Sequence, residues 1–286
     1  MPDAFAGQSE LRLGGRIAAV AEVLAVYVPL MAVWRIAERS AVAEMDQRVF
    51  FHPIGLTVLA LIVLPLFIVG IAGRSIGAYG LCFAQPIRQI GAGLIAFAIL
   101  LPFFLMVPVI GHIGFARKEA TGAAILLVVF AVALVVMGLA ARKLPAALCE
   151  RTPGRGIAAF LLILAVGLVA AGVPHPLQRQ TTAVVYGLLA VGFGEEIFFR
   201  GYVQSRLNQA FGRRFRRWSV SWGWGLVLTS LLFAAAHAVN PHGGIWWSMW
   251  IFPVGLIFGL IREKTGSIIP SALAHGLPVT IGLLTL

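Results

Sequence analysis

Five ionisable side chains stand out because each lies within or at the end of an apolar stretch with few other charges. Glu195, Glu196 and Arg200 belong to "GFGEEIFFRG", while His237 and His275 follow in two later apolar stretches. A carboxylate near the centre of a bilayer costs about 2.5–3.5 kcal/mol on insertion scales, so it needs partners or a hydrated cavity. A carboxylate that meets two imidazoles can activate water, hold a zinc ion, relay protons or bind a cation.

Helical spacing separates the two glutamates. Glu196 and Arg200 are four residues apart, in the order that favours a helical ion pair, and we expect this pair to be structural. Glu195 projects about 100° around the helix from Glu196. It therefore needs a different partner, for which His237 and His275 are the candidates.

The depths of these residues agree if the helix that carries the glutamates continues to about residue 208. At about 1.5 Å per residue, Glu195 is then about 20 Å from the end of that helix. With the same rise per residue, His237 lies about 21 Å from the start of its helix, and His275 lies about 16 Å from the start of its own helix. A helix that ended at Phe199 would instead place Glu195 and His237 near opposite membrane faces, so we expect the longer helix.

The composition indicates the elements that hold these residues. Of 286 residues, 60% are hydrophobic and 12% are charged, with a mean hydropathy of +0.94. A soluble domain of this size cannot bury so much apolar surface, so we predict an all-α, polytopic transmembrane helix bundle with about eight to nine spans. The apolar stretches are 17–34, 54–73, 89–111, 122–141, 156–173, 182–199, 222–238, 245–261 and 266–285. The first is interpreted as an uncleaved anchor, and Glu22 within it as a side chain that reaches the interface.

The distribution of Lys and Arg along the sequence predicts the orientation of the protein in the membrane. With nine spans and a cytoplasmic N-terminus, most of the 22 Lys and Arg residues fall on the cytoplasmic side, as the positive-inside rule expects. The run "FGRRFRRW" at 211–218 is interpreted as a lipid headgroup anchor rather than a nucleic-acid patch, so no nucleic-acid partner is expected. Cys82 and Cys149 fall on the same side, which predicts two free thiols and no disulfide.

Three short motifs resemble those of the CPBP family of intramembrane proteases. They are "EEIFFR" with Glu195, Glu196 and Arg200, "FAAAH" with Phe233 and His237, and "AHGLPV" with His275. That family includes the CAAX prenyl endopeptidase and bacterial relatives linked to bacteriocin processing and immunity. The resemblance covers about residues 182–286, which we predict to be the catalytic transmembrane core. Residues 1–181 are expected to add transmembrane helices of no specific assigned role.

The resemblance implies a role for each motif residue. Glu195 would be the general base that activates water, His237 would share that water, and His275 would help to stabilise the oxyanion. Glu196 and Arg200 would hold the site. If zinc were bound, Glu195, His237 and His275 would be its ligands, although no H-E-x-x-H motif is present and we expect no metal.

One departure from the family pattern concerns the second oxyanion donor. Where the family often has Asn, four residues after His275, this chain has Val279, preceded by Pro278. Asn240 and His242 in "HAVNPHGG" are available as replacements, although a loop at the lipid interface is the simpler interpretation of that segment.

Three hypotheses therefore stand. The first is an intramembrane endopeptidase that hydrolyses a membrane-proximal peptide bond in a membrane-associated protein or peptide. The second is a catalytically silent family member that acts as an immunity or scaffold protein, which Val279 favours. The third is an ion-coupled transporter, although no inverted repeat is visible. We expect an integral protein of the bacterial inner membrane; the sequence leaves the oligomeric state and the substrate open.

Overall fold

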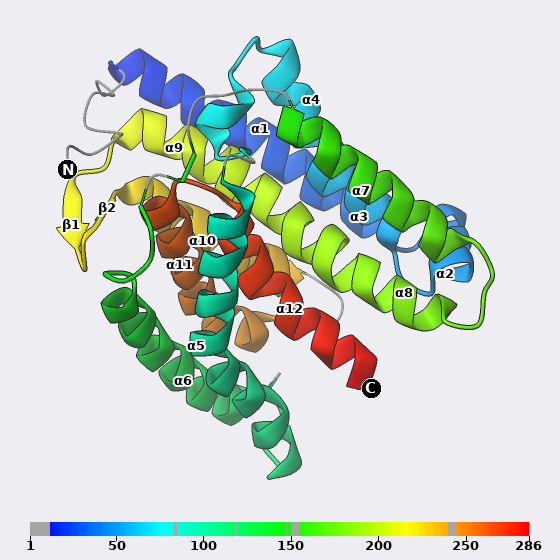
Figure 1. The fold of residues 1–286 in the computed structure, drawn as a ribbon. Helices are drawn as coiled ribbons and strands as arrows, with labels where there is room; N and C mark the ends of the chain where they lie inside the picture. Colours follow the sequence, from blue (N-terminus) through cyan, green and yellow to red (C-terminus); the bar gives the residue numbers. More distant parts are fainter. Residues whose placement is uncertain are drawn as a thin grey trace.

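The computed structural model describes residues 12–82, 85–117, 119–146, 148–149, 155–239 and 244–285, and within them the chain is predominantly helical (Figure 1). The first part of the chain comprises α1 (Leu13–Ala37), α2 (Ala41–Phe50), α3 (Ile54–Val58), η1 (Leu59–Val63), α4 (Leu64–Ile71), η2 (Ile76–Tyr79), α5 (Pro86–His112), α6 (Ala120–Ala140) and α7 (Arg155–Gly172). The second part comprises α8 (Gln178–Val184), η3 (Val185–Phe193), η4 (Glu196–Val203), α9 (Gln204–Phe211), β1 (Phe215–Arg217), β2 (Val220–Trp222), α10 (Trp224–Val239), α11 (Ile245–Thr265) and α12 (Ile269–Thr285).

Each predicted apolar stretch corresponds to an apolar helix, so the all-α membrane class is confirmed. Six helices in the described part of the chain are long and apolar enough to cross a bilayer: Leu13–Ala37, Ile54–Ile71, Pro86–His112, Ala120–Ala140, Gln178–Phe211 and Ile245–Thr265. Three shorter apolar helices accompany them: Ile157–Gly172, Trp224–Val239 and Ile269–Thr285. The described part of the chain thus contains six candidate spans and three shorter apolar helices, and the predicted count of eight to nine spans is not confirmed.

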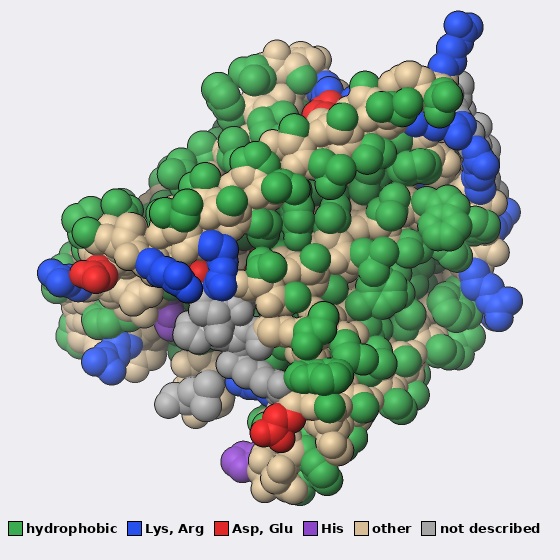
Figure 2. Space-filling model, turned by 180° about the vertical axis from the view of Figure 1, so that it is seen from behind, with side chains coloured by type: hydrophobic (Ala, Val, Ile, Leu, Met, Phe, Trp, Pro, Cys, Tyr) green, Lys and Arg blue, Asp and Glu red, His purple; other side chains and the backbone are tan. Residues whose placement is uncertain are grey.

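The surface agrees with a membrane location. Many large apolar side chains are exposed, among them Val28, Phe67, Ile87, Val128 and Leu162. Figure 2 shows hydrophobic side chains over broad areas of one face, with most charged side chains along two opposite edges. An apolar belt between charged edges is the surface that a bilayer covers.

The glutamates lie on one long helix, as expected from their depth. α8, η3, η4 and α9 form a continuous helix from Gln178 to Phe211, so it extends well past Phe199. Its middle consists of π-helical turns in η3 and η4, a feature that is frequent at functional sites. No periodicity of the sequence had indicated these turns.

Packing around this helix brings distant segments to the glutamates. α12 packs against η3 and α5, while α11 packs against α10 and α6. The contact between α12 and η3 is backbone to backbone, because a Cβ atom on Gly192 would lie 2.7 Å from the Cα of Gly276. These glycines let the helix that carries His275 approach the helix that carries the glutamates.

The arginine-rich run folds as a β-hairpin rather than as a helical extension. β1 and β2 pair antiparallel, with Arg216 opposite Ser221, and the turn residues Trp218 and Ser219 adopt left-handed backbone angles. Both Arg216 and Arg217 are exposed on this hairpin. Their exposure is compatible with the predicted contact to lipid headgroups.

The prediction of two free thiols is wrong. Cys82 and Cys149 form a disulfide with a Cα–Cα distance of 5.5 Å. The prediction rested only on the expected compartment and could not show that the two segments lie side by side. Their proximity is organised by the turn before α12, since the N–H of Leu148 donates to the carbonyl of Thr265.

The interpretation of Glu22 is also corrected. Its carboxylate does not simply reach toward the interface, because it pairs with Arg74 and Arg206 and accepts a hydrogen bond of 3.1 Å from the hydroxyl of Tyr202. These contacts join α1 to the long helix and to the segment after α4. Glu22 is therefore part of the helix packing.

Candidate active site

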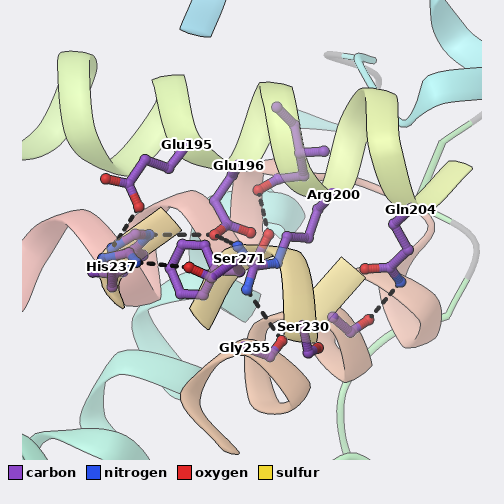
Figure 3. A network of polar contacts seen from close by, with 12 residues as sticks. Glu195, Glu196, Arg200, Gln204, Ser230, His237, Gly255 and Ser271 are labelled. Atoms are coloured by element: carbon purple, nitrogen blue, oxygen red, sulfur yellow. Dashed lines mark hydrogen bonds and ion pairs between the residues drawn. The ribbon is translucent and has the colours of Figure 1, made fainter. Parts of the chain in front are cut away.

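The predicted ion pair of Glu196 and Arg200 is present and completely buried. Nη1 of Arg200 lies 2.9 Å from Oε1 of Glu196, and the two side chains are 1% and 0% exposed. Arg200 also donates from Nη2 to the carbonyl of Gly255 at 3.1 Å, and its guanidinium lies 4.2 Å from the centre of the Phe233 ring. The arginine thus connects the long helix to α10 and α11 (Figure 3).

Glu195 points to the other side of this cluster, toward His237 (Figure 3). Its Oε2 is buried and has no hydrogen-bond partner within the described part of the chain. Nε2 of His275 lies 3.9 Å from this oxygen, which is too long for a direct hydrogen bond but suits a bridging water. Glu195 therefore has a free oxygen, as its separation from Arg200 predicts.

His275 lies between the two glutamates. Its Nδ1 is 3.2 Å from Oε1 of Glu196, while its Nε2 faces Glu195. Because an ionised carboxylate only accepts, Nδ1 is the donor in the contact with Glu196. The ring also stacks on Phe258, with centroids 4.7 Å apart. His275 is consequently held in one orientation by both a hydrogen bond and a stacked ring.

His237 reaches the same region from α10. Its Nδ1 lies 2.8 Å from the carbonyl oxygen of Phe233, and since that oxygen can only accept, Nδ1 donates. In the neutral ring Nε2 then carries a lone pair and can accept a proton or a hydrogen bond. The structure therefore brings all five predicted residues together, although it does not test the roles assigned to them.

A cavity of about 470 Å³ gives access to this cluster. Glu195, Phe199 and His237 line its deep part, while Trp34, Arg35, Glu38, Arg39, Ala43, Gln47, Pro53 and Tyr186 are among the residues that line the remainder. An adjacent hollow of about 310 Å³ between α1 and the α3–α4 segment is lined by apolar residues and shares Trp34 with the cavity. The cluster can thus receive a molecule larger than water.

The residues of the cavity mouth were missed by sequence reasoning. Arg35, Glu38 and Arg39 belong to "WRIAERS", which had served only to argue against signal-peptide cleavage. The three charges directly after an apolar stretch were the only signal in the sequence. Without the path of α1 across the bundle, nothing connected that signal to Glu195.

The zinc ligands considered from the sequence are Glu195, His237 and His275, and zinc binding by them stays a prediction. Within the described residues, no group of three or more His, Cys, Asp or Glu side chains is arranged to hold a metal ion. Nδ1 of His237 donates to a backbone carbonyl and Nδ1 of His275 donates to Glu196, which leaves Nε2 as the remaining nitrogen of each ring, and Nε2 of His275 lies 3.9 Å from Glu195. No step of the chemistry is therefore derived through a metal.

The structure does not identify the second oxyanion donor among Val279, Asn240 and His242. Val279 lies on α12 one turn beyond His275, is half-buried and does not line the cavity. α12 continues through Pro278 to Thr285. Asn240 and His242 lie outside the described residues.

Comparison with known proteins gives one family match. Residues 177–280 match the family model described as type II CAAX prenyl endopeptidase Rce1-like. No curated protein and no solved structure gives a significant match to the chain. The matched segment contains all five clustered residues, and the match confirms the resemblance to the CPBP family.

Proposed function

We propose that this integral membrane protein is an intramembrane endopeptidase that hydrolyses a membrane-proximal peptide bond, because residues 177–280 match the Rce1-like type II CAAX prenyl endopeptidase family model. The observation that carries the proposal is the free, buried oxygen of Glu195 in the wall of a cavity beside two imidazoles. An unpaired carboxylate oxygen at that position can bind and deprotonate a water molecule.

In the proposed reaction Glu195 takes a proton from water while the water oxygen bonds to the scissile carbonyl carbon. Nε2 of His237 accepts a hydrogen bond from the second hydrogen of that water and orients it. When the tetrahedral intermediate collapses, Glu195 returns its proton to the amide nitrogen as the C–N bond breaks. Atoms and charge then balance without any further reactant.

The remaining residues stabilise and position this pair. His275, fixed by Glu196, can direct Nε2–H toward the developing oxyanion when its ring is protonated. Arg200 pairs with Oε1 of Glu196, the same oxygen that contacts His275, and thereby helps to position that ring. The apolar hollow beside the cavity supports a substrate that is itself anchored in the membrane.

Orientation is a further part of the proposal. The cavity mouth belongs to the end of α1 that is remote from the arginine-rich hairpin. With a cytoplasmic N-terminus in a bacterial inner membrane, that mouth opens toward the outer face. The partner would then be a membrane protein or lipidated peptide cleaved on that side.

The decisive experiment compares purified wild-type protein with Glu195→Gln on peptides from a membrane fraction, with new termini identified by mass spectrometry. We expect new termini with the wild type only, with Glu195→Gln at least 100-fold slower, since a general base contributes about 10²–10⁴-fold. Thermal unfolding in detergent should be alike for both proteins. Equal cleavage by both would remove Glu195 from the mechanism.

The same assay separates the alternatives. A silent scaffold or an ion-coupled transporter would yield no new termini with either protein. A strong chelator, followed by elemental analysis, tests the metal. We expect activity to persist and the metal content to stay far below one per chain, whereas a stoichiometric zinc whose removal stops cleavage would establish a metalloprotease.

A further inference from the structure

The arginine-rich hairpin is fixed against the ends of two candidate membrane-spanning helices, α6 and α11. β2 packs against α11 and buries Val220. The turn residue Trp218 lies against Gly138 on α6, where an added Cβ atom would overlap the indole ring. At the base of the hairpin, Nε of Arg213 donates to Oε2 of Glu263. The hairpin is therefore a preformed surface rather than a flexible tail.

Basic side chains from three elements gather around this hairpin. They are Arg142 and Lys143 after α6, Arg216 and Arg217 on β1, and Lys264 on α11. Four of them are exposed, Lys264 is half-buried, and none has an ion-pair partner within the described residues. Arg216 lies close enough to Lys264 for the two positive charges to repel each other. An anion that binds between such cations would relieve this repulsion.

The described carboxylates at this end of the molecule are already engaged. Both oxygens of Glu263 accept hydrogen bonds inside the protein, and its charge is balanced by Arg213. Glu22 pairs with Arg74 and Arg206. Within the described residues, the surface around the hairpin therefore keeps a net positive charge, which attracts an anion from outside the protein.

Aromatic side chains beside these cations indicate that the surface lies at the membrane interface. The Phe215 ring lies 4.8 Å from the ring of Trp222 and 6.1 Å from that of Trp224. Phe215 is 39% exposed and Trp224 is 51% exposed. Tryptophan collects at the level of the lipid headgroups, because its ring is apolar while its N–H is polar. The anion available at that level is the lipid phosphate, to which a guanidinium group can donate two parallel hydrogen bonds.

We propose that the hairpin and the ends of α6 and α11 together form a binding site for the headgroup of an anionic phospholipid. A zwitterionic headgroup carries a cation of its own, which the basic cluster repels, so the site selects lipids with a net negative charge. Because the cations are held by packed elements, little conformational entropy is lost on binding. The site is thus more specific than the general attraction of a basic segment to lipid, and it does not depend on the cleavage reaction.

The test measures lipid binding to the purified protein in a non-ionic detergent. Phosphatidylglycerol and phosphatidylcholine with the same acyl chains are titrated separately, and bound lipid is counted by native mass spectrometry. We expect phosphatidylglycerol to bind at least about tenfold more tightly, because each basic residue near an anionic lipid surface contributes a factor of about five. The difference should shrink as salt is raised, since salt screens exposed charges. Equal affinities for the two lipids would overturn the proposal.

A pair of matched variants connects the preference to the hairpin. Arg216→Gln together with Arg217→Gln should weaken the binding of phosphatidylglycerol about tenfold or more and leave the binding of phosphatidylcholine unchanged. The control is Arg48→Gln together with Arg179→Gln, which removes two exposed arginines from α2 and α8 at the other end of the molecule (Figure 1). The control should bind phosphatidylglycerol like the wild type. An undiminished affinity of the hairpin variant, or an equal loss in the control, would contradict the assignment.

Two further measurements keep the test decisive. If the hairpin variant unfolds at a lower temperature than the wild type, Arg142→Gln together with Lys143→Gln tests the same site from the end of α6, with the same expected loss. Inorganic phosphate should not displace the lipid, because it lacks acyl chains to lie beside the aromatic residues. Displacement by inorganic phosphate, or by a short single-stranded RNA at the same salt concentration, would assign the surface to another anion and overturn the lipid site.

Discussion

Two buried carboxylates, Glu263 and Glu195, lie at the same long helix. They differ in how completely their carboxylate oxygens are hydrogen-bonded. Around Glu263, Oε1 accepts from Nε2 of Gln204 at 2.7 Å and from Nδ2 of Asn208, while Oε2 accepts from Nε of Arg213. Around Glu195, Oε2 has no partner within the described residues and faces a cavity. Both clusters are polar groups buried among apolar helices.

This difference distinguishes a carboxylate with a structural role, Glu263, from one that can act on a bound molecule, Glu195. The oxygens of Glu263 are all used within the protein, so its carboxylate can only hold α11 against α9 and the hairpin segment. Glu195 leaves one oxygen for a molecule that enters from outside. A buried polar group left unsatisfied is costly, so the free oxygen of Glu195 calls for an explanation, and the cavity beside it offers one. Glu196 differs from both, since its Oε1 contacts Arg200 and His275 while its Oε2 has no hydrogen-bond partner in the described part of the chain, and the residue does not line the cavity.

The largest effect on stability should therefore come from Glu263. Glu263→Gln removes the carboxylate that pairs with Arg213, and the loss of one partner of a buried pair costs about 3–5 kcal/mol. Chemical unfolding in detergent micelles should show this loss, with Glu195→Gln as the matched control that changes the unfolding free energy by less than about 1 kcal/mol. The reverse order, with Glu195→Gln the less stable protein, would contradict the comparison.

A smaller effect on stability should follow from a substitution that loosens the contact between α12 and η3. This contact brings His275 close to Glu195 and Glu196. A Cβ on Gly192 would lie 2.7 Å from the Cα of Gly276 and 2.9 Å from the carbonyl oxygen of Ala272, and neither atom can move without its helix. Gly192→Ala should push α12 away, cost about 1–3 kcal/mol as overpacking does, and lower peptide cleavage.

The control for this substitution is on α12 itself. Gly282→Ala meets nothing within 4 Å, so cleavage and unfolding should stay at wild-type values. If Gly192→Ala cleaved peptides as fast as Gly282→Ala, the close approach of α12 to η3 would have no part in the site.

The sequence predicted those parts of the molecule that depend on local spacing. The pair of Glu196 and Arg200 needs only a helix, and the continuation of that helix past Phe199 follows from depth. The parts that it missed depend on contacts between distant segments. These are the disulfide of Cys82 with Cys149, and the mouth residues, whose relation to Glu195 depends on the packing of α1.

The π-helical turns of η3 and η4 were also out of reach for sequence reasoning. η3 is almost entirely apolar, so it has no periodic pattern from which a change of helical pitch could be inferred, and the two charges of η4 are too few to provide one. Likewise, the short distance between Gly192 and Gly276 is visible only once both helices are placed. The motifs identified the glutamates, whereas the packing of distant helices determined that Glu195 and not Glu196 lines the cavity.

The smallest expected effect concerns Val279, where the chain departs from the family pattern. The loss of one oxyanion donor typically lowers the rate about 10²–10³-fold, and the side chain of valine donates nothing. His275 is then the principal side-chain donor in the proposal, so His275→Ala should cost at least that factor in the peptide cleavage assay. Val279→Asn, which places an amide one helical turn from His275, should leave the rate unchanged or raise it a few-fold. Because Val279 is only half-buried, the substitution should hardly alter thermal unfolding in detergent, which serves as its control. A stable Val279→Asn protein with a clearly lower rate would mean that the apolar side chain at this position is itself needed, and that the second donor comes from another part of the chain.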